Sequence, residues 1–231
     1  MLLKEMLEYF QSGELAQLFV GADNPLRPEN IKKLSLNINL GLLEIHKLLP
    51  VIEEELIIQQ YEHIGNYHLT KEYALTNSES TKPYKYIIDA PAVPFKDNLL
   101  KIIRVYSETG EELPLNDPST IYSLYTPSFN VLNIPYPSND KAVSVLFLGH
   151  PSLIDISEDI DLNTNIDIPL FLLEPLSIFL SHKILGVVSV NINESINYMN
   201  RFSNAIKEIE LSGILNRDNI SNLRLENRGW V

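Results

Sequence analysis

The side chains of this sequence that could bind a metal ion or transfer a proton are five histidines and thirty acidic residues. His63 and His68 are five positions apart on a predicted strand, so their side chains face opposite sides of it. The chain has no H-E-x-x-H sequence and no cysteine, which excludes common zinc patterns and thiolate chemistry. His46, His150 and His182 come without supporting context for a catalytic role. We therefore expect no metal site and no catalytic histidine.

The segment Asp159–Asn163 resembles the beginning of a calcium-binding loop, because oxygen-bearing side chains occupy alternate positions. The sixth position of such a loop needs glycine for a sharp turn, and the sequence has Thr164 there. The twelfth position needs a bidentate glutamate, and the sequence has Leu170. The segment is therefore predicted to be a solvated acidic loop.

Glycine and serine patterns give no sign of a cofactor or a nucleophile. The two closest glycines, Gly13 and Gly21, are too far apart for a phosphate-binding loop or a dinucleotide fingerprint. No G-x-S-x-G sequence is present. We expect no cofactor and no catalytic residue, so the chain is predicted not to be an enzyme. A hydrolase with dispersed carboxylates, Asp155 or Glu158 among them, remains an open alternative.

The formal net charge of the chain is −12. Proteins that grip phosphates need clustered Lys and Arg, so this balance argues against a nucleic-acid-binding surface. An acidic, self-repelling surface keeps a protein soluble. Acidic walls also suit a channel through which DNA slides without binding, and charge alone does not decide between the two.

The most apolar stretch, IDIPLFLLEPLSIFLSHKILG, covers residues 166–186. Glu174 and other polar residues divide it into pieces much shorter than the ~20 residues of a membrane span. We expect a buried helix with Asp167 as its cap, a kink at Pro175 and an end at Gly186. A helix that is apolar almost all round must be covered by its own domain or by neighbouring subunits.

Helical spacing of apolar residues predicts further helices over residues 2–10, 30–50 and 193–211. The last of these carries one apolar stripe of five side chains, namely Ile196, Met199, Phe202, Ile206 and Ile209. Residues 51–150 are rich in Ile, Val and Tyr and predict strands, with the clearest hairpin over residues 99–117. Its turn is Ser107–Gly110, where glycine is free to take a positive φ.

The predicted fold class is α+β: a helical bundle formed by N- and C-terminal helices, with a small antiparallel β-domain inserted. The helices are expected over about residues 2–50 and 168–211, and the β-rich block over about 51–150. Together these form a single predicted domain, 1–215, followed by a polar C-terminal arm, 216–231.

The order of these elements is similar to that of a known family. The phrases that carry the likeness are LNINLGLLEIHKLLP, LLKIIRVYSETGEELPLND, TPSFNVLNIP, AVSVLFLGHP and IDIPLFLLEPLSIFLSHKIL, in that order. The chain resembles, over about residues 30 to 210, the head-to-tail adaptor (connector or ring) proteins of short-tailed phages. Among these it is most similar to the ring proteins of crAss-like gut phages.

The resemblance implies a structural virion protein of the neck or tail, assembled in the host cytoplasm. Such a protein forms a cyclic homo-oligomer, commonly a dodecamer, that docks on the portal protein and extends the DNA ejection channel. It also presents a surface for other tail or ring proteins. Genomic DNA passes through the channel without sequence-specific binding, and no membrane is involved.

Two groups of residues are the candidate contacts of such a ring. Within the apolar stretch, we expect a subunit interface at Phe171, Leu172, Pro175 and Phe179. In the C-terminal arm, we expect portal binding through Leu223, Leu225, Arg228 and Trp230, because Trp and Arg often anchor interfaces. The alternative is a tail, receptor or fibre-binding module without a channel role, which would bind through its tyrosine-rich strands. Most of the eleven tyrosines lie between Tyr61 and Tyr136, which also suits plain packing on a half-buried sheet.

Overall fold

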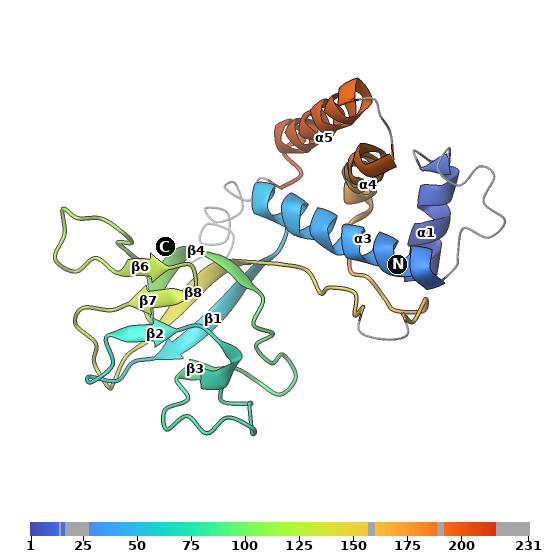
Figure 1. Cartoon of the computed structure of the whole chain (residues 1–231). Coiled ribbons are helices and arrows are strands. Elements are labelled where there is room, and N and C mark those ends of the chain that lie inside the picture. The colour runs from blue at the N-terminus through green and yellow to red at the C-terminus, as the bar shows by residue number, and fades with distance from the viewer. Residues whose placement is uncertain (14, 17–27, 157–159, 189–191, 216–231) are drawn as a thin grey trace, which may run out of the picture. The chain divides into compact units, whose positions relative to one another are not determined.

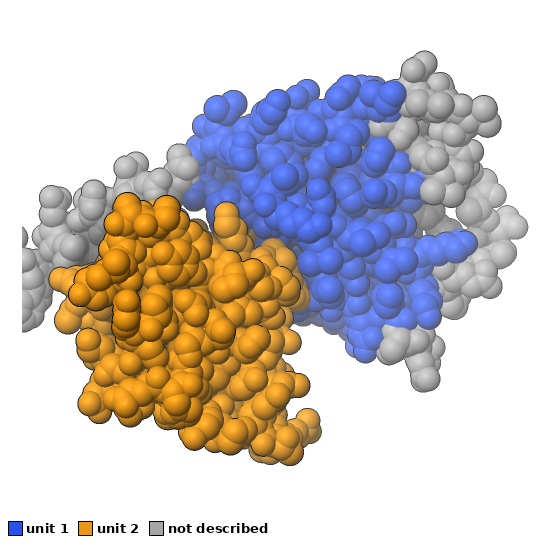
Figure 2. Space-filling view, turned by 60° about the vertical axis from the view of Figure 1, so that its left-hand side comes forward, with its two compact units in different colours: residues 1–50, 151–231 blue, residues 51–150 orange. Residues whose placement is uncertain are grey.

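The computed structural model describes residues 1–13, 15–16, 28–156, 160–188 and 192–215. Over these ranges the chain is α+β, with four α-helices and eight strands. It divides into two compact units, one made of residues 1–50 and 151–231 and the other of residues 51–150 (Figure 2). We call them the helical unit and the β-unit and describe each by itself.

Among its described residues, the helical unit contains four α-helices from the two ends of the chain (Figure 1). They are α1 (Leu3–Ser12), α3 (Pro28–Leu48), α4 (Leu173–Val188) and α5 (Ile192–Ser212), with a 3-10 turn, η2 (Leu170–Leu172), directly before α4. On α3 the predicted stripe is buried from end to end at Ile31, Leu34, Ile38, Leu42 and Ile45. His46 and Lys47 lie in its last turn, where positive charge is favoured by the helix dipole.

Helix α4 packs against both α3 and α5. The side chains of Leu176, Ile178 and Leu180 are buried within one copy of the chain. Gly41 of α3 makes the close approach possible, because a Cβ there would lie 2.5 Å from Leu176 Cδ1 and 2.9 Å from a ring carbon of Phe179. The chain's own helices therefore cover most of this helix.

Three details of the α4 prediction are wrong. The helix begins at Leu173, so Asp167 does not cap it. Pro175 therefore lies in the first turn, where its missing N–H needs no partner, and not two turns into the helix. The helix also continues past Gly186 to Val188.

Hydrogen bonds join the start of the chain to the segment that leads into α4. The amide nitrogens of Leu3 and Lys4 donate to the carbonyl oxygens of Thr164 and Leu162, at 2.9 and 3.0 Å. On α3, the buried side chain of Asn39 accepts from the amide of Ile154 and donates to its carbonyl oxygen, both at 2.9 Å. These bonds hold together parts of the helical unit that the whole β-unit separates in sequence.

The β-unit contains two antiparallel sheets (Figure 1). The five-stranded sheet has the order β3-β1-β8-β4-β5, and the three-stranded sheet has the order β2-β7-β6. The strands are β1 (Glu53–Gln59), β2 (Asn66–His68), β3 (Ile87–Ile88), β4 (Leu99–Ser107), β5 (Glu112–Leu113), β6 (Tyr125–Ser128), β7 (Val131–Asn133) and β8 (Ala142–Gly149), with a 3-10 turn, η1 (Lys71–Tyr73), after β2. The hairpin of β4 and β5 confirms the prediction for residues 99–117, and Gly110 in its turn has a φ of 83°.

The predicted helical bundle with a small inserted β-domain is therefore wrong. The strands are not a small appendage, because they form two sheets over a hydrophobic core of their own. That core includes Leu56, Val145 and Phe147 from one sheet and Tyr67 and Leu132 from the other. The error arose because several strands have only two to four residues, too few for a visible alternation.

Two tyrosines place their rings in this core and hydrogen-bond to the backbone through their hydroxyl groups. The hydroxyl of Tyr67 accepts from the amide of Tyr61 at 2.8 Å, and the hydroxyl of Tyr86 accepts from the amide of His68 at 2.7 Å. The two rings meet edge to face with centroids 5.0 Å apart. Burial raises the pKa of both phenols. Both therefore stay neutral donors and acceptors inside the β-unit.

Candidate interaction site

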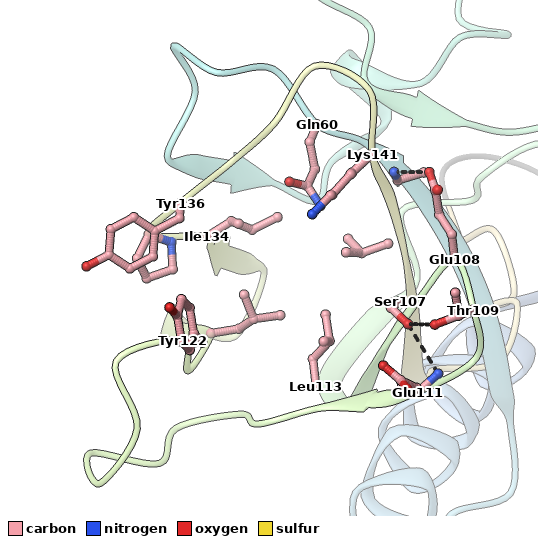
Figure 3. A pocket seen from close by; sticks show the side chains of 14 residues that line it. Gln60, Ser107, Glu108, Thr109, Glu111, Leu113, Tyr122, Ile134, Tyr136 and Lys141 are labelled. Atoms are coloured by element: carbon pink, nitrogen blue, oxygen red, sulfur yellow. Dashed lines mark hydrogen bonds between the residues drawn. The ribbon is translucent and has the colours of Figure 1, made fainter.

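A pocket of about 420 Å³ lies in the β-unit (Figure 3). The β4–β5 hairpin, the start of β8 and the segments around Tyr122 and Tyr136 surround it. Pairing of strands distant in sequence brings these segments together. Its apolar lining includes Leu113, Leu124, Ile134 and Val143. The pocket can therefore receive an apolar group.

The polar side chains of the pocket hold the hairpin turn in place. Glu108 Oε1 accepts a hydrogen bond from the amide of Ala142 at 2.5 Å. The hydroxyls of Ser107 and Thr109 lie 2.8 Å apart, and Ser107 Oγ also accepts from the amide of Glu111 at 3.2 Å. The described partners of Ser107 are thus a hydroxyl and an amide rather than a base, so the arrangement is suited to binding.

Two exposed tyrosines form the rim of the pocket opposite this turn (Figure 3). Tyr122 is 69% exposed and Tyr136 is 67% exposed, and their rings meet in a T-shaped pair with centroids 6.1 Å apart. Ile121 beside them is also exposed. Aromatic side chains with one polar end are enriched at protein interfaces. The rim is thus the best candidate contact surface of the β-unit.

Three of the histidines lie on different segments: His46 in α3, His63 between β1 and β2, and His68 in β2. His46 is buried, with Nδ1 2.7 Å from the carbonyl oxygen of Leu42, and His63 lies against the rings of Tyr61 and Tyr84. His68 stacks on Tyr73 with centroids 6.2 Å apart. Within the described ranges, no group of three His, Cys, Asp or Glu side chains could hold a metal ion.

Of the four predicted interface residues, Phe171 and Leu172 lie in η2, and Pro175 and Phe179 lie in α4. Leu172, Pro175 and Phe179 are buried inside the helical unit, and Phe171 is partly exposed. Phe179 packs against Phe202 of α5 with ring centroids 5.4 Å apart, and the ammonium group of Lys183 lies 5.2 Å from its centroid. In this conformation only Phe171 of the four is accessible to another copy.

The predicted portal contacts, Leu223, Leu225, Arg228 and Trp230, lie outside the described residues, as does the whole arm. Of the two carboxylates named for a hydrolase, Asp155 is described and Glu158 is not. Asp161 in the acidic loop accepts a hydrogen bond from the amide of Asn163 at 2.9 Å, the geometry of a local turn.

Exposed apolar side chains occur on two helices. On α3, Leu36 and Leu40 are 47% and 45% exposed, and they lie one turn apart on the side away from the buried stripe. On α5, Ile196 and Met199 are exposed, although they continue the stripe of buried residues. The sequence analysis did not single out the pair on α3. The only sign of it in the sequence is that two further apolar residues of this helix are four positions apart.

No family model matches this chain, and the comparison with curated proteins finds no match. Among the described helices, none is long and apolar enough to cross a membrane.

Proposed function

We propose that this protein is a structural adaptor of a phage neck, which forms a ring on the portal protein and presents a surface for the next tail component. The observation that carries the proposal is the exposed apolar surface of α3 and α5. The order of elements along the chain, described above for residues 30 to 210, supports the same function.

The α3 surface consists of Leu36 and Leu40, which follow one another on the helix at a spacing of four. The buried stripe of the same helix already fills the core of the helical unit through Ile38 and Leu42. The exposed leucines are therefore not needed for the fold of one copy. Complete burial of a leucine is worth about 1.5–3 kcal/mol relative to full exposure. Leu36 and Leu40 are already about half buried, so a second surface that covers them gains roughly half of that for each.

The α5 surface is an extension of the core. Phe202, Ile206 and Ile209 are buried, whereas Ile196 and Met199 of the same stripe are exposed. The stripe thus continues beyond the part that the helical unit covers. In a ring, two different patches of neighbouring copies meet head to tail, and the surfaces of α3 and α5 are two such patches.

The net charge of −12 suits a channel wall that DNA passes without binding, and it equally suits an ordinary soluble surface. In this proposal the protein has no catalytic activity. The β-unit carries the surface for the next component, and its pocket is the natural contact point.

The test is assembly on the portal protein of the same phage, followed by native mass spectrometry and electron microscopy of the complex. The wild-type chain is expected to form a ring on the portal. The variant Leu36→Glu/Met199→Glu is expected to lose it, whereas Val93→Glu, a matched change at an exposed residue of the β-unit, retains it. A wild-type chain that stays monomeric with the portal overturns the proposal, and a double variant that assembles normally removes its main support.

A second candidate is favoured by the exposed tyrosine pair at the pocket. It is an interaction module that binds a tail or fibre protein through the β-unit and has no channel role. The wild-type chain would then bind that partner, and the variant Tyr122→Ala/Tyr136→Ala would not. Neither protein would assemble on the portal.

A further inference from the structure

The two tyrosines at the rim of the pocket are exposed, yet the chain holds them in place. Tyr136 stands between Pro135 and Pro137, whose rings fix the backbone angle φ on both sides of it. Directly after them, the amide of Ser138 donates to the side chain of the buried Gln60 at 3.0 Å. The backbone that carries Tyr136 is therefore anchored at the end of β1.

Tyr122 is anchored through the residues that follow it. Ser123 is fully buried, and its hydroxyl accepts a hydrogen bond from the amide of Asp117 at 2.9 Å. The amide of Leu124 donates to the carbonyl oxygen of Pro114, directly after β5, at 2.8 Å. Exposed rings that are already held in place cost little to order when a partner covers them. Such rings are typical anchors of protein interfaces.

The side of the pocket opposite the tyrosines is acidic. Glu108 and Glu111 both belong to the β4–β5 turn and are exposed. The bond from Ala142 holds the carboxylate of Glu108 in place, and a carboxylate has about four acceptor positions, so it can accept further bonds. Lys141 also lines the pocket, next to Gln60, whose amide donates to its carbonyl oxygen. Two carboxylates against one ammonium group leave the lining negatively charged.

Among the described strands around the pocket, none offers a free edge to a partner. β8 lies between β1 and β4, and β4 lies between β8 and β5. β5 has two residues, and just beyond it Pro114 and Asn116 hydrogen-bond to Leu124. Adding a strand needs an open row of backbone N–H and C=O groups. A ligand of this pocket therefore binds through side chains, with its own backbone left in water.

Arginine fits the charged side of the pocket. Its guanidinium group is planar, stacks on tyrosine rings and pairs with carboxylates through parallel hydrogen bonds. Its alkyl stem can lie along an apolar floor while the charged end stays at the rim. The net charge of the whole chain, −12, also attracts a basic partner and repels an acidic one.

Proline fits the tyrosine side. A proline-rich segment adopts polyproline II, an extended form without internal hydrogen bonds whose backbone stays solvated. Segments of this kind bind in grooves lined by aromatic side chains and need no strand edge. The rings of Tyr122 and Tyr136 meet at an interplanar angle of 63°, so they form a corner of aromatic surface that suits a proline ring.

We propose that the pocket binds an extended, proline-rich segment of a partner protein that carries an arginine. The prolines lie against Tyr122 and Tyr136, and the guanidinium group pairs with Glu108 and Glu111. This inference rests on the proposed function, in which the β-unit contacts the next component, and it adds the chemistry of that contact. We expect a dissociation constant of about 10–100 μM for one segment. A ring of copies that binds several segments together gains avidity.

The experiment begins with a yeast-displayed library of random short peptides, which is sorted on the full-length chain and counter-sorted on Tyr122→Ala/Tyr136→Ala. The sequences enriched on the wild-type chain are expected to carry arginine beside proline. The most enriched peptide is then synthesised with a fluorescent label and titrated with each protein, and its anisotropy is measured. Binding should weaken by more than about tenfold in Tyr122→Ala/Tyr136→Ala and in Glu108→Gln/Glu111→Gln.

Charge changes distinguish an arginine site from a nonspecific apolar surface. Glu111→Lys is expected to lose the arginine peptide, whereas Lys141→Gln is expected to retain it, because this substitution removes a like charge. Phe129→Ala and Glu79→Lys are matched changes at exposed residues of the β-unit outside the pocket. Both should bind the peptide like the wild type, and circular dichroism checks that every variant is folded.

Enriched sequences that lack arginine or lack proline, or a library from which nothing is enriched, would overturn the inference. Equal binding by the tyrosine variant would do the same, and so would loss of binding in Lys141→Gln, which indicates an acidic ligand. Assembly on the portal is measured separately with the α3 and α5 variants. A chain that forms the ring but selects no such peptide refutes this inference alone, and a chain that selects the peptide but stays monomeric refutes the ring alone.

Discussion

Asn39 is the residue that ties α3 to the chain returning from the β-unit. Both its hydrogen bonds go to the backbone of Ile154, and the side chain is buried. Asn39→Ala leaves a buried N–H and a buried carbonyl without partners, which costs about 1–3 kcal/mol for each group. We expect a loss of about 2–4 kcal/mol in the free energy of unfolding, measured by urea denaturation.

The matched control lies one half-turn away on the same helix. Asn37 donates to the carbonyl oxygen of Lys33 at 3.0 Å in an exposed position. Asn37→Ala should change stability by less than about 0.5 kcal/mol. Equal effects of the two substitutions would show that the Asn39 bonds do not hold the unit together.

Asp89 gives the β-unit a pH dependence. Burial raises the pKa of its carboxyl group, but hydrogen bonds from Thr76 and the amide of Phe95 outweigh burial and hold the pKa below its usual range. A lowered pKa stabilises the folded state above the unfolded value of about 3.9, and this contribution is lost as the pH falls through the folded pKa.

Asp89→Asn should therefore be less stable than the wild type at pH 6, by about 1–2 kcal/mol because the group is only partly buried. The difference should shrink as the pH falls below about 4. Denaturation of both proteins across this range measures it, and a difference that stays constant down to pH 2.5 contradicts the assignment.

At the scale of elements, the burial of α4 shows whether the helical unit has a full core within one copy of the chain. Leu180 is fully buried between the chain's own helices, whereas Leu170 just before α4 is exposed. Leu180→Ala should lower stability by about 2–5 kcal/mol, and Leu170→Ala should change it by less than about 0.5 kcal/mol. Thermal unfolding of dilute, monomeric protein compares them; a small effect of Leu180→Ala would mean that other copies are needed to bury α4.

The sequence predicted correctly the elements in which the apolar repeat extends over several helical turns. The stripe of α3 is buried as expected, and on α5 Phe202, Ile206 and Ile209 are buried too. Ile196 and Met199 are exposed, because periodicity gives the side of a helix that is apolar but not how far its cover extends. In the same way, Pro175 looks alike in the sequence whether it lies in a first turn or inside a helix.

The candidate site could not be predicted from the sequence, for a different reason. Its pocket joins Gln60, the Ser107–Glu111 turn and Tyr136, which come together only through pairing of distant strands. Tyr122 and Tyr136 are exposed while Tyr67 and Tyr86 are buried, although all four lie in the same tyrosine-rich region. A local pattern does not distinguish them.

At the scale of the whole molecule, the β-unit should fold alone. It has its own core, and none of the pairings of its named strands involves a residue outside 51–150. We expect a fragment of residues 51–150 to be soluble and to unfold cooperatively. Dispersed amide signals in a two-dimensional NMR spectrum would verify this, and a spectrum typical of a disordered chain would refute it.

The first and last strands of the β-unit, β1 and β8, are direct neighbours in one sheet, with Glu53 opposite Leu148. The polypeptide thus enters and leaves the β-unit at adjacent positions. Any foreign module whose two ends lie equally close could be spliced in at that point without disturbing the helices. The β-unit is therefore free to be exchanged during evolution as one continuous insert, while the remainder of the chain keeps its sequence.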